Sequence, residues 1–271
     1  MTIVSMQKIN QKLITLWGQY RHLNHTLAPM QYPDGDKGAL LFVGINPSFS
    51  IKGWNSVLKK AGTPFIAHNT QFNNCDDVKD YYHWPTSNSN LPSYPAATAL
   101  EGLAHKHYSQ FFSWHTKLSS HINKSWFHAD LFSFRKTTQK GGRALSVDTS
   151  SCKNCGKCLL CFNHAQFQIF LEIVDAIEPC AIIVCNALAS QIYYGYCRAN
   201  NIVVANQNAG YFEHRLSSKT GPGVPLFFSG MLTGGRALDI DSRNRLFWQV
   251  SQTLKNSGHN VNLWDLANAK P

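Results

Sequence analysis

An apolar run that ends abruptly in a polar turn is the feature that most constrains how this chain folds. Residues 40–45, Leu-Leu-Phe-Val-Gly-Ile, have the length and apolar content of a buried strand. Asn46-Pro47-Ser48 follow directly with turn chemistry. Because open α/β sheets bind ligands beyond the carboxyl ends of their strands, we expect Asn46 to lie at a ligand-binding edge.

Further apolar runs alternate with helical spacing along the chain. Strands are predicted at residues 39–45, 125–132, 181–185, 202–205 and 224–229, and helices at 5–20, 100–118, 164–177 and from Asp241 or Ser242 as the cap. Strands that alternate with helices form right-handed βαβ units. We therefore expect one α/β domain over residues 1–271, a three-layer α/β/α sandwich around a central, mainly parallel sheet of about four strands.

The predicted helix over residues 100–118 carries an apolar stripe, most of which we expect to be buried. The stripe consists of Leu100, Leu103, His107, Phe111, Trp114 and Leu118.

Composition narrows the classes of partner. The N-terminus lacks the apolar segment of an export signal, and no apolar stretch reaches the length of a bilayer span, so we expect a cytoplasmic monomer without a membrane partner. Lys and Arg total 25 against 15 Asp and Glu, a net charge of +10. A basic surface favours a polyanion, most commonly nucleic acid. The paired carboxylates of a magnesium nuclease do not accompany the histidines at positions 68, 83, 105, 107 and 128.

Four segments resemble, in the same order, the motifs of the uracil-DNA glycosylase superfamily. Residues 44–47, Gly-Ile-Asn-Pro, are similar to the first active-site motif of the mismatch-specific uracil-DNA glycosylases. Residues 62–68 resemble the family's Pro-Phe segment, and residues 178–189 look like its third strand and the helix that follows. Residues 228–236 stand where the second active-site motif belongs, so the resemblance covers roughly residues 38–255.

The resemblance implies DNA repair by a monofunctional glycosylase. Such an enzyme flips a deaminated or damaged base out of single- or double-stranded DNA and hydrolyses its N-glycosidic bond without a catalytic metal. Asn46 would position the water, backbone N–H groups at Ile45 and Ser48 would donate to the base, and Phe65 would stack on it. Two alternatives are a catalytically silent nucleic-acid-binding protein of the same fold and a glycosidase that acts on free nucleosides or tRNA.

Asp130 departs from the family's pattern at the end of the second predicted strand. Uracil-specific relatives carry a base-reading Asn at this place. An ionised Asp only accepts hydrogen bonds, so it would suit a base that presents an amino or ring N–H group and would disfavour a uracil carbonyl. The alternative is a structural role, as an ion-pair partner of Arg135 or as a helix cap.

The second active-site motif departs further, because Ser229-Gly-Met-Leu232 replaces the family's His-Pro-Ser or Asn-Pro-Ser. Ser229, the backbone N–H of Gly230 or Arg236 could supply the hydrogen-bond donor for the leaving base that the missing His would otherwise provide. Met231 or Leu232 could be the apolar wedge that fills the gap left by a flipped base. Alternatively, both side chains simply pack beneath the loop.

Residues 136–162 are a polar stretch that we expect to be an inserted loop. Four of the eight cysteines lie in ten consecutive residues of this stretch. Thiolates at this density repel one another unless a cation neutralises them, so we predict a structural metal site. Both a tetrahedral zinc ion and a 4Fe-4S cluster fit the spacing, and Cys75 or Cys197 could complete a cluster. Some uracil-DNA glycosylase families carry such a cluster; free surface thiols are the remaining alternative. The predicted ligands are Cys152, Cys155, Cys158 and Cys161.

Overall fold

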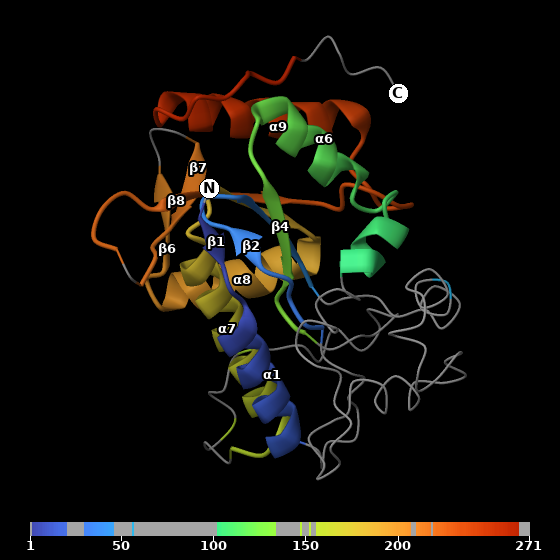
Figure 1. The fold of residues 1–271 in the computed structure, drawn as a ribbon. Helices are drawn as coiled ribbons and strands as arrows, with labels where there is room; N and C mark the ends of the chain where they lie inside the picture. Colours follow the sequence, from blue (N-terminus) through green and yellow to red (C-terminus); the bar gives the residue numbers. More distant parts are fainter. Residues whose placement is uncertain are drawn as a thin grey trace.

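A six-stranded sheet forms the centre of the protein (Figure 1). The computed structural model describes residues 2–20, 30–45, 56, 102–133, 147, 152, 156–206, 210–217 and 219–265. The strand order is β4-β3-β5-β8-β7-β6. In chain order, the strands are β3 (Leu40–Gly44), β4 (Trp126–Asp130), β5 (Ala181–Cys185), β6 (Val203–Asn206), β7 (Tyr211–His214) and β8 (Val224–Ser229).

The sheet confirms the predicted class and adds an antiparallel extension. Strands β4, β3, β5 and β8 are mutually parallel, whereas β7 pairs antiparallel with both β8 and β6. The sheet therefore has six strands where about four were expected. Strand β7 has no counterpart among the predicted strands, because it is four residues long and three of these are only half-buried, which leaves no clear apolar signal.

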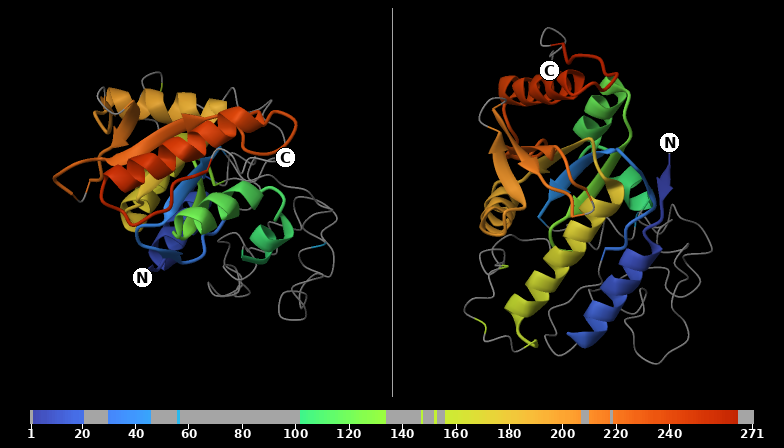
Figure 2. Two further views of the ribbon diagram at one scale, coloured as in Figure 1. Left: turned by 90° about the horizontal axis from the view of Figure 1, so that it is seen from above. Right: turned by 90° about the vertical axis from the view of Figure 1, so that its left-hand side faces the viewer.

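Helices cover both faces of the sheet, as the three-layer prediction requires (Figures 1 and 2). Alternate residues of a strand point to opposite faces. On β3, Leu41 and Val43 pack with one group of helices, and Leu40 and Phe42 pack with the other. The first group is α1 (Gln7–Gln19), α7 (Leu159–Ile177) and α8 (Ala187–Ala199), and the second is α6 (Ser113–Ile122) and α9 (Ile240–Asn256).

The predicted helix over residues 100–118 is broken in the structure. Residues 102–107 are helical, a turn follows, and α6 begins at Ser113. In the turn, the hydroxyl group and the backbone N–H of Ser113 both donate to the carbonyl of Gln110. The break changes the buried face: Phe111 is 43% exposed, whereas Phe112 and His115 are buried.

Two helix starts also differ from the prediction. Helix α7 begins at Leu159, so Cys161 lies in its first turn and the Cys-rich loop ends earlier than residue 162. The N-cap of α9 is Asp239, whose carboxylate accepts a hydrogen bond from the N–H of Ser242.

A short antiparallel pair, β1 (Ile3–Val4) with β2 (Gly35–Asp36), lies outside the main sheet. Within the described part of the chain, no helix combines the length and apolarity needed to cross a bilayer.

Candidate functional site

The carboxyl ends of the parallel strands meet at an edge where the strand order reverses. Strand β3 pairs on one side with β4, the next parallel strand along the chain. On its other side β3 pairs with β5, and the next parallel strand after β5, β8, lies farther out on that side. Open α/β sheets hold their ligand crevice at such a topological switch point. The residues at the ends of the four strands are Ile45, Asp130, Asn186 and Ser229. The predicted site residues Ile45, Asp130 and Ser229 therefore share one edge of the sheet.

The Asp130 carboxylate lies close to both the backbone of Gly44 and the ring of His128. Asp130 is 4% exposed, and its Oδ2 lies 3.5 Å from His128 Nε2. A Cβ atom on Gly44 would come within 2.1 Å of Asp130 Oδ1, so this close approach requires glycine. The hydroxyl group of Tyr32 accepts from the N–H of Asp130 and donates to its carbonyl, both at 3.4 Å. Arg135, the ion-pair partner considered above, lies outside the described residues.

Buried imidazole and aromatic rings fill the space between β4 and α6. His115 of α6 is 1% exposed, and its ring centroid lies 5.5 Å from that of His128 and 4.1 Å from that of Phe42. Burial first, and then the proximity of His128 and His105, lowers the pKa of His115 well below its ordinary value, so its ring is neutral. Sequence reasoning missed His115, because a histidine on the buried face of a helix has no distinctive spacing.

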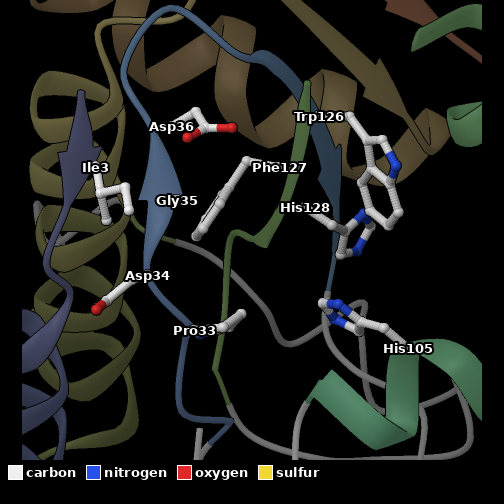
Figure 3. Close-up of a pocket in the computed structure, with 9 residues that line it drawn as sticks. All are labelled: Ile3, Pro33, Asp34, Gly35, Asp36, His105, Trp126, Phe127 and His128. Carbon is white, nitrogen blue, oxygen red and sulfur yellow. The ribbon is translucent and has the colours of Figure 1, made fainter. Parts of the chain in front are cut away.

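A cavity of about 370 Å³ lies beside the outer edge of β4 (Figure 3). The cavity adjoins His105 and His128 rather than the switch point. The rings of these two residues and of Trp126 line one side of it. The remaining lining residues come from the β1–β2 region and from Phe127. They are Ile3, Pro33, Asp34, Gly35, Asp36 and Phe127.

Helix α8 begins directly after β5 at the switch point. The Asn186 side chain accepts hydrogen bonds from the N–H groups of Leu188 at 3.0 Å and Ala189 at 3.1 Å. Asn186 was not among the predicted site residues, although Asn before an apolar helical segment is a recognisable N-cap signal. The hydroxyl group of Ser190 donates to the carbonyl of Asn186 at 2.9 Å and also lies 3.4 Å from the carbonyl of Ser229, so the start of α8 contacts the end of β8.

The residues of the second predicted motif differ in burial and in their contacts. The Ser229 hydroxyl donates to the Gly230 carbonyl at 3.0 Å, so this donor is used locally. Leu232 is 2% exposed and packs in the core cluster on the α6–α9 face, which favours the packing interpretation over the DNA wedge. Met231 is half-buried and Arg236 is exposed, so both side chains are accessible to a partner.

Three predicted residues of the active site, Asn46, Ser48 and Phe65, lie outside the described residues. Their roles stay predictions from the sequence. Cys155 is also outside the described part of the chain.

Three of the four predicted metal ligands gather at the N-terminus of α7. The Sγ atom of Cys152 lies 3.1 Å from that of Cys158 and 3.2 Å from that of Cys161, and the Cys158 and Cys161 Sγ atoms are 3.6 Å apart. This arrangement could hold a metal ion or cluster. Cys197, considered above as a remote ligand, is instead buried in the core on the α7–α8 face, and burial raises the pKa of its thiol. Cys75 is outside the described residues.

The chain was compared with protein-family models and with curated proteins. No protein-family model matches the chain. A search among curated proteins also gives no match.

Proposed function

We propose that the protein is a DNA base-excision glycosylase that hydrolyses the N-glycosidic bond of a deaminated or damaged base. The observation that carries the proposal is the placement of Ile45, Asp130 and Ser229 along one edge of a parallel sheet, at the carboxyl ends of β3, β4 and β8. These three positions belong to segments that resemble the uracil-DNA glycosylase superfamily. The net charge of +10 suits a phosphate backbone as partner.

Hydrolysis needs a water at the anomeric carbon and stabilisation of the departing base. The water oxygen bonds to C1′ of the sugar while the C1′–N bond breaks, its electron pair leaves with the base, and a water proton is released. Asn46 would orient that water through its amide oxygen. Backbone N–H groups at the end of β3 would donate to the base as negative charge grows on it.

Asp130 is the residue that we expect to choose the base. A buried carboxylate that faces the O4 atom of uracil would meet another acceptor, and such an unpaired charge costs several kcal/mol. At about 1.4 kcal/mol per tenfold in rate, uracil excision would be suppressed by orders of magnitude. The preferred base would present an N–H donor, such as an amino group, to Asp130 at the position where uracil carries O4.

The test is a cleavage screen over oligonucleotides that carry uracil, hypoxanthine, xanthine or mismatches. We expect excision of a donor-bearing base, weak activity on uracil, and a gain on uracil in Asp130→Asn. Asn46→Ala should remove most turnover while DNA affinity and melting temperature stay nearly unchanged. If the protein binds these DNAs but releases no base from any of them, the silent nucleic-acid-binding alternative replaces the enzyme.

We propose zinc as the metal at the cysteine site, with Cys155 as the fourth ligand. A tetrahedral zinc ion with Zn–S bonds of about 2.3 Å places its thiolate sulfurs about 3.8 Å apart. The observed separations of 3.1, 3.2 and 3.6 Å are close to that value. In a 4Fe-4S cluster, each cysteine binds a different iron, so the sulfurs lie farther apart than thiolates that share one ion.

Metal analysis of protein purified without oxygen tests this assignment. We expect about one zinc per chain, a colourless solution, and loss of the metal in Cys158→Ser with Cys161→Ser. Cys180→Ser is the matched control, since Cys180 is buried elsewhere in the core and should not affect metal content. A brown protein that contains iron would reverse the choice, and metal-free protein with an unchanged melting temperature would remove the site altogether.

A further inference from the structure

The His128 ring lies beside the Asp130 carboxylate. Strand β4 directs Trp126, His128 and Asp130 to the same face of the sheet, because alternate residues share a face. His128 is 6% exposed, and its Nε2 lies 3.5 Å from Asp130 Oδ2. Its other ring nitrogen, Nδ1, is buried without a hydrogen-bond partner in the described part of the chain. Among the described residues, the ring nitrogen of His128 that has a polar group nearby is therefore Nε2, beside the Asp130 carboxylate.

Among the described residues, aromatic rings surround His128. The ring centroid of His128 lies 5.3 Å from that of Phe112, 6.1 Å from that of Phe111 and 5.5 Å from that of His115. Neither ring nitrogen of His115 has a hydrogen-bond partner among the residues that the structure describes. A carboxylate as buried as that of Asp130 is costly unless a donor reaches it. The tautomer of His128 that carries its proton on Nε2 would offer such a donor.

We propose that His128 is a positioning residue for Asp130: its Nε2–H donates to Asp130 Oδ2 and fixes the orientation of the carboxylate at the strand edge. One carboxylate oxygen is thereby occupied, and Gly44 fixes the side-chain position from the other side. The remaining lone pairs serve a ligand that offers an N–H group. This inference rests on the proposed function for its consequence, which is that His128 contributes to the choice of base through Asp130.

A double-mutant cycle tests the consequence. His128→Phe keeps an aromatic ring but removes the donor, and we expect kcat/KM on the donor-bearing base to fall about tenfold to a hundredfold. His128→Gln keeps an amide N–H group and should recover most of that loss. In an Asp130→Asn background, His128→Phe should have little further effect. Equal losses from His128→Phe in both backgrounds would show a merely structural role and overturn the proposal.

A second measurement does not depend on catalysis. Long-range ¹⁵N–¹H spectra of the free protein assign the protonated nitrogen of each imidazole. We expect His128 to carry its proton on Nε2 and Asp130→Asn to shift that proton's resonance. An unprotonated Nε2, or a resonance that Asp130→Asn leaves in place, overturns the pairing even if the enzyme is active. If the pairing is found but no base is excised, the pairing stands and the glycosylase assignment fails.

Discussion

Gly44 is required by its neighbour rather than by its own backbone. A Cβ at this position would lie 2.1 Å from Asp130 Oδ1 and 3.2 Å from His128 Nε2. Since these side chains are buried, neither can move aside without disturbing the core. The first residue of the Gly-Ile-Asn-Pro segment therefore has a steric explanation, which the sequence pattern alone does not supply.

Replacement of Gly44 by Ala should consequently lower the free energy of unfolding by about 1–3 kcal/mol, as overpacking of a core does. Urea denaturation measures the change. Gly102→Ala is the matched control: it lies in a helical segment, and its added Cβ would meet nothing within 4 Å. That control should be neutral or slightly stabilising, because Ala is the better helix former. Equal stability of Gly44→Ala and Gly102→Ala would contradict the close packing of Asp130.

Among the elements, helix α8 depends on a single side chain for its start. Asn186 satisfies two backbone N–H groups of the first turn, and the hydroxyl group of Ser190 in this turn contacts the carbonyl of Ser229 on β8. The cap thus fixes one side of the switch point as well as the helix itself.

We expect Asn186→Ala to destabilise the protein by about 0.5–2 kcal/mol, because two N–H groups lose their acceptor. Asn186→Ser keeps a capping oxygen and should retain most of the stability. Thermal unfolding of the two variants beside the wild type gives the comparison. A melting temperature for Asn186→Ala that equals that of Asn186→Ser would mean that the cap does not stabilise α8.

For the whole molecule, two buried imidazoles make stability depend on pH. Burial lowers the pKa of His214 from 6.5 to about 4, although the Asp175 carboxylate opposes the effect, and burial also lowers the pKa of His115. Above pH 6.5 both residues are neutral in the folded and unfolded chains. As the pH falls below 6.5, the unfolded chain binds protons that the folded chain does not, so stability is lost.

Urea denaturation at pH 7.5 and pH 5 should therefore show a weaker fold at the lower pH, with each imidazole contributing up to about 1.4 kcal/mol per pH unit. His214→Asn removes one of these imidazoles and should reduce the difference between the two pH values. Its overall stability will also change, because His214 Nδ1 is hydrogen-bonded to Tyr193 at 2.8 Å. A pH difference that the substitution leaves unaltered would exclude His214 as a contributor.

The sequence predicts the central parallel strands well, because runs such as 181–185 are apolar on both faces and leave a strong signal. It also places Ile45, Asp130 and Ser229 at a common edge, since the carboxyl ends of parallel strands meet there. It fails where tertiary contacts decide. Neither the break before α6 nor the contact between His128 and Asp130 leaves a local pattern to read, and the roles of Asn46, Ser48 and Phe65 stay predictions.

The cysteine site is coupled to helix α1 through Phe162, the residue after Cys161. The Phe162 ring centroid lies 4.9 Å from that of Trp17 and 5.0 Å from that of Tyr20. Ligand loss at the start of α7 should therefore change the environment of an indole that is 1% exposed. Trp17 thus becomes an internal optical probe: chelation should red-shift the part of the emission spectrum that Trp17→Phe removes. An identical spectral change in wild type and Trp17→Phe would show that the probe does not sense the site.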